Sequence, residues 1–227
     1  MDVVPDVLPT IDPVVSTELA FPTSTNKLKR VAHGDIIPST LSEQAPTLWI
    51  QPYTRGTKLV TIAIVNPDVP NVEQDGFDHR CHFLAVNIPV SATDTRVQLA
   101  ALQDVIQAYI PAYAQKGAPY QRMSIFILEQ SAPPSSTLDP ALYEHQPLDV
   151  AAIRADARWT KPHGFNLRSF VDRFGLKPIG ADLFRTVWDE GTAGVMQRAG
   201  INGWDVEFRR KRVEPLPYKR KASERYR

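Results

Sequence analysis

The stretch between Asn66 and Pro89 contains side chains that could take part in catalysis or metal binding. It reads NPDVPNVEQDGFDHRCHFLAVNIP, with an acid between two prolines, two histidines and the only cysteine of the chain. His79, Cys81 and His82 are zinc ligands by type. Along a β-strand, however, neighbouring side chains point to opposite faces, so Cys81 and His82 are poorly placed to share one ion. We therefore expect neither a metal site nor a cysteine–histidine nucleophile pair here.

Asp68 stands between Pro67 and Pro70, which fix φ on both of its sides. The pattern predicts a stiff loop that leaves a buried strand and holds the carboxylate in one place. Two interpretations are open. Asp68 could orient the imidazole of His82 toward a small pocket. Alternatively, Asp68 could bond within its own turn, and His82 could be a hydrogen-bonded histidine of the core.

The rest of the sequence lacks the common catalytic motifs. It has no Gly-x-Ser-x-Gly elbow, no Gly-x-x-x-x-Gly-Lys phosphate loop and no Gly-x-Gly-x-x-Gly dinucleotide motif. No complete set of base and nucleophile can be assembled either. We therefore predict no enzyme, no catalytic residue and no cofactor.

Three apolar, β-branched runs must form the core that positions these side chains. They are Lys58–Asn66, His82–Pro89 and Arg122–Gln130, and each is typical of a buried strand. Residues 1–45 alternate short apolar pieces with prolines, which indicates edge strands and extended connections. The segment 95–121 suits a helix or a strand, and the pattern does not decide between them. Together these runs predict an all-β sandwich.

The C-terminal part of the chain has helical patterns. Asp149 and Asn166 are placed to cap the segments VAAIRADARW and LRSFVDRF, and Gly175 ends the second. We also expect a strand at Phe184–Trp188 and a short helix over EGTAGVMQRAG that closes at Gly200.

Charge is unevenly distributed along the 227 residues. The whole chain has a net charge of +1, but residues 206–227 contain nine basic and three acidic residues, a net of +6, which leaves −5 for the rest. A basic C-terminal segment after a mildly acidic domain is typical of a tail that binds a polyanion. A solvent-exposed terminus that binds nothing can have the same composition. A single cysteine forbids an internal disulfide, which fits a reducing compartment. No apolar run reaches about 18 residues, so we expect no membrane insertion.

The sequence resembles the phosphatidylethanolamine-binding protein family over nearly all of residues 1–205. The stretches that carry the resemblance are, in order, LVTIAIVNPDVP, HFLAVNIP, YIPAYAQKGAPYQRMSIFILEQ, FNLRSFVDRFGL and LFRTVWDE. The resemblance implies a mainly β fold, a large antiparallel β-sandwich with a few C-terminal helices, and a small pocket that binds a phosphate group. We expect a domain of this kind at 1–205 and a basic C-terminal extension at 206–227.

The resemblance also implies where that pocket lies and how it has changed. Asp68 and His82 match the second acid of the family's Asp-Pro-Asp-x-Pro motif and the histidine of its His-Phe-Leu strand. Asn66 stands at the first acid, Gln121 at a histidine that precedes an arginine, and Tyr113 at a glycine. Glutamine cannot be cationic, and a ring in place of glycine obstructs close backbone approach. We therefore predict a degenerate pocket with weak or absent phosphate binding and no small-molecule substrate.

Within the family, the sequence is most similar to the branch that is built into the fungal mitochondrial large ribosomal subunit. The stretches PDVLPTIDP, QDGFDHRCHFLAVNIP and GWDVEFRRKRVEPLPYKRKASERYR carry this similarity. It implies a structural ribosomal component in the mitochondrial matrix that contacts ribosomal RNA and other large-subunit proteins. The candidate contact residues are Arg209, Arg210, Lys211, Arg212, Lys219, Arg220 and Lys221.

Two points remain open from the sequence. Four acids precede the first basic residue, Lys27, so no transit peptide is visible, and we expect a processed or truncated form. The alternative function is a free-standing ligand-binding or regulatory protein that uses the Asp68/His82 pocket. Such a protein needs the pocket but not the basic tail, whereas a ribosomal protein needs the tail and tolerates the loss of the pocket.

Overall fold

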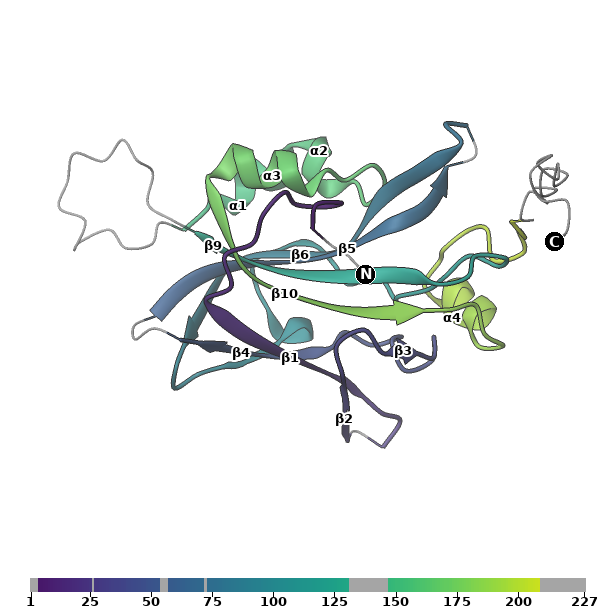
Figure 1. Cartoon of the computed structure of the whole chain (residues 1–227), viewed down its shortest axis with the longest axis horizontal. Helices are drawn as coiled ribbons and strands as arrows, with labels where there is room; N and C mark the ends of the chain where they lie inside the picture. Colours follow the sequence, from purple (N-terminus) through teal and green to yellow (C-terminus); the bar gives the residue numbers. More distant parts are fainter. Residues whose placement is uncertain (1–3, 26, 54–56, 72, 131–146, 209–227) are drawn as a thin grey trace, which may run out of the picture.

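The computed structural model describes residues 4–208 except 26, 54–56, 72 and 131–146. Two β-sheets pack face to face, and a layer of helices covers the outer face of the larger sheet (Figure 1). The smaller sheet has the strand order β2-β1-β4-β7. Its strands are β1 (Val15–Pro22), β2 (Leu28–Val31), β4 (Thr47–Pro52) and β7 (Arg96–Gln98).

The larger sheet has the strand order β3-β10-β9-β5-β6-β8 and is antiparallel except for the short β3–β10 pair. Its strands are β3 (Ile36–Ile37), β5 (Thr57–Asn71), β6 (Gly76–Ser91), β8 (Val105–Gln107), β9 (Gln121–Gln130) and β10 (Leu176–Thr186). The helices are η1 (Leu99–Ala101), α1 (Val150–Ala155), α2 (Ala157–Thr160), α3 (Leu167–Phe174) and α4 (Thr192–Arg198). The prediction of a mainly β fold with a few late helices is confirmed.

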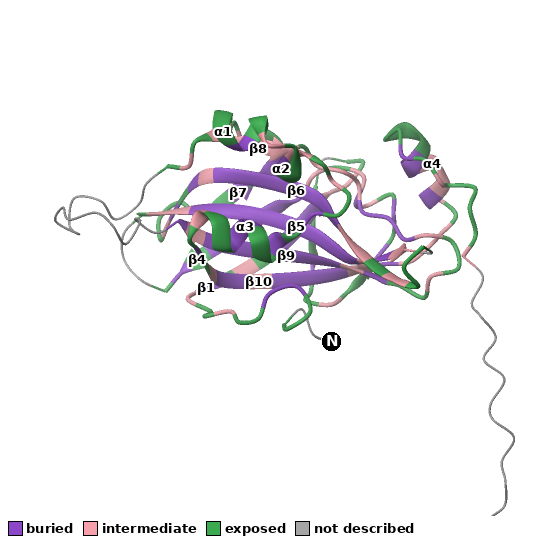
Figure 2. Cartoon of the chain, turned by 90° about the horizontal axis from the view of Figure 1, so that it is seen from above, coloured by how far each residue is buried: buried purple, intermediate pink, exposed green. Residues whose placement is uncertain are grey.

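Two hydrophobic clusters lie on the two faces of the larger sheet (Figure 2). The cluster between the sheets includes Leu19, Ile50 and Ile62, all fully buried. The cluster beneath the helices joins Phe126 of β9 to Phe170 of α3 and similar side chains. Both faces of the central strands are therefore covered, which explains why their sequences are apolar almost without interruption.

The three predicted apolar strands are confirmed as the adjacent central strands β9, β5 and β6. The loop predicted around Asp68 is wrong, because β5 continues through Pro67 and Pro70 to Asn71. The register with β6 shifts between Asn66 and Val69, so a β-bulge contains Pro67 and Asp68, while Pro70 lies beyond the bulge, opposite Phe77. A residue within a bulge donates no ladder hydrogen bond, and Pro67 is therefore tolerated there.

Proline also misled the prediction for the ends of the chain. The segment 15–22 was expected at a sheet edge, but β1 lies between β2 and β4, since its prolines stand outside or at the end of the strand. Similarly, β10 begins at Leu176 instead of Phe184, because Pro178 lies at an irregularity in the pairing with β9. The ambiguous segment 95–121 contains short strands and a single 3-10 turn.

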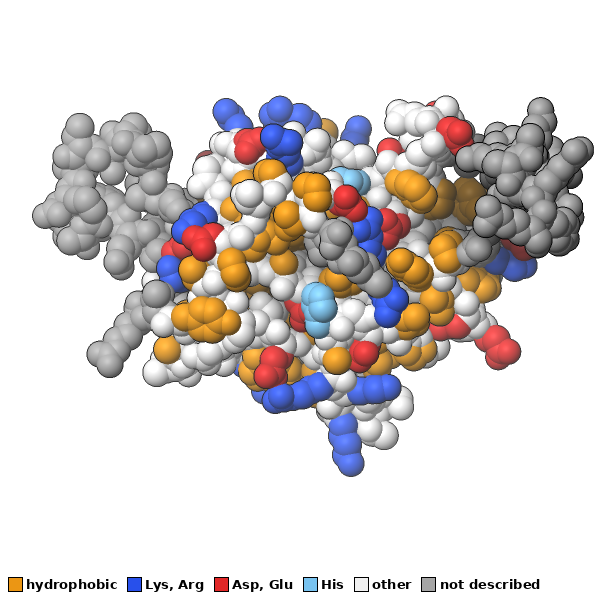
Figure 3. Space-filling model, viewed as in Figure 1, with side chains coloured by type: hydrophobic (Ala, Val, Ile, Leu, Met, Phe, Trp, Pro, Cys, Tyr) orange, Lys and Arg blue, Asp and Glu red, His pale blue; other side chains and the backbone are white. Residues whose placement is uncertain are grey.

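The predicted helix caps are confirmed. Asp149 accepts a hydrogen bond from the backbone N–H of Ala152, and Asn166 accepts one from Ser169. Gly175 ends α3 with a φ of 59°, in the left-handed region that favours glycine. The segment expected to form one helix after Asp149 is divided into α1 and α2, because Asp156 ends the first and caps the second. In Figure 3, Lys and Arg side chains gather over the helical layer and again beside β2.

Candidate functional site

The bulge in β5 carries Asp68, and its carboxylate binds Arg122 at the start of β9. The guanidinium donates from Nε to Oδ2 over 2.9 Å and from Nη2 to Oδ1 over 2.6 Å, and the backbone N–H of Arg122 donates to Oδ2 over 2.8 Å. Arg122 also donates to Asp6 over 2.7 Å. The hydrogen bonds to Asp68 are the main reason that the pKa of Arg122 is raised. The Asp68 carboxylate thus ties two central strands together.

The structure corrects both roles offered for Asp68, but it confirms the second interpretation of His82, which is a buried core histidine hydrogen-bonded to the Ile110 carbonyl. The carboxylate binds Arg122 and does not orient the imidazole of His82. The local turn bond is made instead by Asn66, whose Oδ1 accepts a hydrogen bond from the backbone N–H of Asp68 over 2.9 Å. The sequence does not show which of the two residues accepts the hydrogen bond of the turn, because the side chains of Asn66 and Asp68 are both able to accept it.

Asn66 and Gln121 form a buried pair of neutral amides. Asn66 Nδ2 donates to Gln121 Oε1 over 2.9 Å, and Gln121 Nε2 donates to the backbone carbonyl of Asp68 over 3.0 Å and to Gln115 Oε1. The two residues are 1% and 0% exposed. Since their hydrogen bonds connect them to each other and to the backbone, they stabilise the bulge without contributing charge to the pocket.

His82 lies at the bottom of the predicted pocket and is fully buried. Its Nδ1 lies 3.0 Å from the carbonyl oxygen of Ile110, which assigns the proton to Nδ1. Its Nε2 is buried and has no partner among the described residues. Burial lowers the pKa of His82 to about 4, with Arg80 acting in the same direction. At neutral pH the imidazole is therefore uncharged, and it cannot supply a cation for a phosphate.

Tyr113 and Arg80 fill the space beside His82. The Tyr113 ring lies 5.8 Å from the His82 ring, is 2% exposed, and packs with Met196 and Ile201 near α4. Arg80 donates to the Tyr113 hydroxyl, and its guanidinium carbon lies 5.3 Å from the centre of the Tyr113 ring. A side chain of this size, held from two sides, closes the opening that a glycine would leave.

Sequence reasoning missed Arg80, which is 8% exposed and faces Asn66 across the β5–β6 pair. Strand periodicity gave no reliable signal, because the register with β5 shifts between Cys81 and Phe83, so a β-bulge at His82 interrupts the alternation of faces. Arg80 and His163 line a remaining hollow of about 390 Å³ with Ile110 and residues 199–202. His82, Asn66 and Gln121 are not among the residues that line it. The structure thus places all five predicted pocket residues near one another but leaves this hollow outside them.

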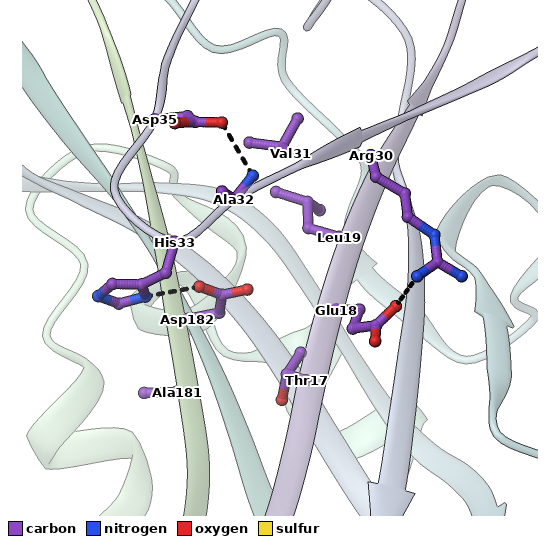
Figure 4. A pocket seen from close by; sticks show the side chains of 10 residues that line it. All are labelled: Thr17, Glu18, Leu19, Arg30, Val31, Ala32, His33, Asp35, Ala181 and Asp182. Carbon is purple, nitrogen blue, oxygen red and sulfur yellow. Dashed lines mark hydrogen bonds and ion pairs between the residues drawn. The ribbon is translucent and has the colours of Figure 1, made fainter.

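A second hollow of about 550 Å³ lies between the β1–β2 hairpin and β10 (Figure 4). Four of its five titratable side chains pair with one another, and the fifth, Asp35, accepts a hydrogen bond from the backbone N–H of Ala32. His33 Nδ1 lies 2.8 Å from Asp182 Oδ1, and Arg30 Nη1 lies 2.6 Å from Glu18 Oε2. None of the predicted site residues lines this hollow.

The remaining predictions about chemistry and membranes concern residues outside both hollows. Cys81 is fully buried, and burial raises the pKa of its thiol to about 12, so the thiol packs as a small apolar group. No group of three or more potential metal ligands occurs among the described residues.

No helix in the described part of the chain has the length and hydropathy to cross a membrane. The seven candidate contact residues at 209–221 lie outside the described residues.

The sequence profile described as "Phosphatidylethanolamine-binding protein" matches residues 27–169, more than half of the chain. The chain belongs to the phosphatidylethanolamine-binding protein (PEBP) family. Residues 27–169 include the PEBP positions Asn66, Asp68, His82, Tyr113 and Gln121. The family assignment made from the sequence is therefore confirmed.

Solved structures support the PEBP fold. The phosphatidylethanolamine-binding protein from Plasmodium vivax superposes with a TM-score of 0.58 at 14% identity, over 82% of this chain and 92% of that protein. A carboxypeptidase Y inhibitor, solved in complex with its cognate proteinase, has a TM-score of 0.53 at 14% identity, over 78% of this chain and 85% of that one. At these identities the similarity shows the PEBP fold alone.

A curated relative extends the comparison beyond the fold. The Large ribosomal subunit protein mL38 of Schizosaccharomyces pombe is 26% identical over 206 residues, which cover 90% of this PEBP chain. The aligned part is 58% of the length of that protein. The chain therefore spans a little over half of its curated relative.

Proposed function

We propose that this chain is a structural component of the mitochondrial large ribosomal subunit. The observation that carries the proposal is the 26% identity to the large ribosomal subunit protein over 90% of the chain. In this role the protein resides in the mitochondrial matrix, contacts ribosomal RNA and neighbouring large-subunit proteins, and catalyses no reaction.

The state of the pocket supports a structural role over a ligand-binding one. Gln121 and Asn66 are neutral and bonded to each other, His82 is buried and uncharged at neutral pH, and Tyr113 closes the opening. A phosphate site needs donors that converge on an accessible point, and charged donors bind about twice as strongly as neutral ones. We infer that the pocket is degenerate and that its residues now stabilise the sandwich.

We propose that the domain at 1–205 docks on the large subunit and that the basic extension at 206–227 contacts ribosomal RNA. The extension has a net charge of +6, and Lys and Arg bind phosphates with a release of counterions that makes binding sensitive to salt. Its candidate contacts are Arg209, Arg210, Lys211, Arg212, Lys219, Arg220 and Lys221. Their geometry lies outside the described residues.

The rival role is a free-standing PEBP-like ligand-binding or regulatory protein. It would require the Asp68/His82 pocket to accept a ligand, but Asp68 is occupied by Arg122 and His82 is fully buried. Affinity purification of the tagged, full-length chain from mitochondria separates the two roles. The ribosomal proposal predicts recovery of large-subunit ribosomal RNA in amounts near one copy per copy of the bait, with little small-subunit RNA. Recovery of the bait without that RNA would support the rival role.

A further inference from the structure

The layer formed by α1, α2 and α3 has a charge opposite to that of the rest of the body. Residues 150–174, from the start of α1 to the end of α3, contain five basic and two acidic residues, a net of +3. The other residues of 1–205 contain twelve basic and twenty acidic residues, a net of −8. Lys and Arg side chains gather over this outer layer, as they also do beside β2 (Figure 3).

The helices of this layer direct their cations toward solvent. Ile153, Trp159 and Phe170 face the larger sheet and are buried. Among the outward residues, five are exposed cations: Arg154, Arg158, Lys161, Arg168 and Arg173. Five other outward positions have small, exposed side chains: Ala151, Ala152, Ala155, Ala157 and Ser169. The layer also has two acids, Asp156 and the exposed Asp172, so a polyanion meets five exposed cations, two acids and small side chains on this face.

Four of these cations have no ion pair within the described part of the chain, and three of the four form no side-chain hydrogen bond there either. Arg158 pairs with Asp156 over 2.5 Å, and Arg154 donates to the backbone carbonyl of Val105 over 2.7 Å, a contact that leaves its charge uncompensated. No ion pair is found for Lys161, Arg168 or Arg173 among the described residues. The pKa of the Asp156 carboxyl is lowered mainly by its hydrogen bonds to Arg158, and Arg173 lies near enough to contribute but forms no ion pair with it. Lys161, Arg168 and Arg173 are all exposed to an external anion.

We propose that the outer face of α1, α2 and α3 is an RNA-docking surface, with Lys161, Arg168 and Arg173 contacting backbone phosphates. This inference rests on the proposed ribosomal function and adds a second RNA contact on the folded body, apart from the basic extension. The contacts are made to phosphates and not to bases, so binding is largely independent of sequence and falls with salt.

The composition of the layer favours RNA over an anionic membrane surface. Helices that lie on membranes combine basic residues with large apolar side chains that insert between the lipids. The exposed large hydrophobic residues of the described chain all lie elsewhere, for example Phe77 and Tyr53. Trp159 is 4% exposed and packs against Phe165, Phe170 and Phe174, so it is not free to insert.

The test compares two triple variants of the full-length chain. The variant Lys161→Gln, Arg168→Gln, Arg173→Gln removes the free cations of the helical layer. The matched control Lys27→Gln, Lys29→Gln, Arg96→Gln removes the same charge from exposed positions in or beside the smaller sheet, on the other side of the sandwich. Binding of a fluorescent 20-base-pair RNA duplex is measured by anisotropy between 50 and 200 mM KCl. The same proteins are mixed with vesicles that contain phosphatidylserine.

The helical variant is expected to bind the duplex roughly tenfold more weakly, and its slope of log affinity against log salt should decrease by about 2. The control variant should keep the wild-type slope. Equal slopes for the two variants, or a loss of vesicle binding with unchanged RNA binding, would overturn the inference. Failure of the wild-type chain to associate with large subunits contradicts the proposed function instead, and it is measured separately from duplex binding.

Discussion

At the scale of single residues, four side chains at the predicted pocket positions are buried: Asn66, His82, Tyr113 and Gln121. Gln121 supplies an amide where a histidine was expected, and that amide bonds to Asn66 and to the backbone carbonyl of Asp68. Tyr113 fills the position of a glycine and is held by Arg80. His82 itself is fully buried, and these neighbours support our proposal that the pocket is degenerate.

The first prediction concerns phosphate binding. Titration of phosphoethanolamine into the labelled protein, with the His82 imidazole followed by NMR, should give no saturable shift in the micromolar range, because the ring is buried and neutral. A Tyr113→Gly variant is the matched comparison, since it reopens space without adding charge, and it should bind only weakly. Saturable micromolar binding by the wild-type chain would contradict the proposal that the pocket is degenerate.

The second prediction concerns pH. The pKa of His82 is about 4 in the folded protein, against roughly 6.5 in an unfolded chain. Between these values the unfolded chain binds more protons, so the stability contributed by the neutral imidazole is complete above pH 6.5 and is lost as the pH falls toward 4. The loss is roughly 3 kcal/mol between pH 7 and pH 4.

Urea unfolding at both pH values measures this difference. The variant His82→Gln keeps a donor for the Ile110 carbonyl but does not titrate. Between pH 7 and pH 4, its free energy of unfolding should therefore fall by roughly 3 kcal/mol less than that of the wild-type chain. Equal pH dependence in the two proteins would refute the assignment of a depressed pKa to His82.

Much of this site could be anticipated from the sequence, but its bonding could not. The sequence predicts a changed pocket from three residues: Asn66, Tyr113 and Gln121. They stand where the family motif has an acid, a glycine and a histidine, and we expect neither a neutral amide nor a ring to replace these groups in phosphate binding. The partner of Asp68 depends on the register between β5 and β9, which periodicity does not fix. Arg80 was overlooked because a charged residue in an apolar strand is ordinarily read as exposed.

At the scale of the elements, the bulge in β5 is stabilised by contacts to β9. Asp68 and Arg122 form two-point hydrogen bonds with side chains that are 18% and 16% exposed. Asn66 and Gln121 connect the same two strands one step away. A segment with two prolines therefore remains within the sheet, even though it cannot form a full ladder of backbone bonds.

The third prediction tests this link. Asp68→Asn should lower the free energy of unfolding by about 2 kcal/mol in urea, because the half-buried Arg122 loses its two-point carboxylate partner. Asp156→Asn is the matched control. It removes a carboxylate from an exposed pair with Arg158, while asparagine still caps α2, so its effect should be much smaller. Equal losses in the two variants would show that the Asp68 link contributes little.

The strands that the sequence predicts best are those with the strongest burial. β5, β6 and β9 are apolar on both faces, and Asn166 and Gly175 mark the ends of α3 by capping chemistry alone. The errors at β1 and β10 share a cause. Proline was taken as a sign of an edge or a break, whereas the sheet accommodates Pro178 at an irregularity in the pairing with β9.

At the scale of the whole molecule, the three layers separate structural and electrostatic roles. The two sheets contain the core, and the helical layer from α1 to α3 carries a net charge of +3 on a body that is otherwise acidic. With the +6 extension, this gives two basic regions that a polyanion of the size of ribosomal RNA can contact. Such an arrangement suits an assembly component better than a soluble carrier of small ligands.

The most direct test of the ribosomal assignment is sedimentation of the full-length tagged chain in a mitochondrial extract, on a sucrose gradient that separates the two ribosomal subunits. The account predicts that the chain travels with the large subunit at moderate salt. A chain truncated after Asp205 should shift toward the top of the gradient. If the full-length chain stays at the top while large-subunit RNA sediments normally, the assignment is contradicted.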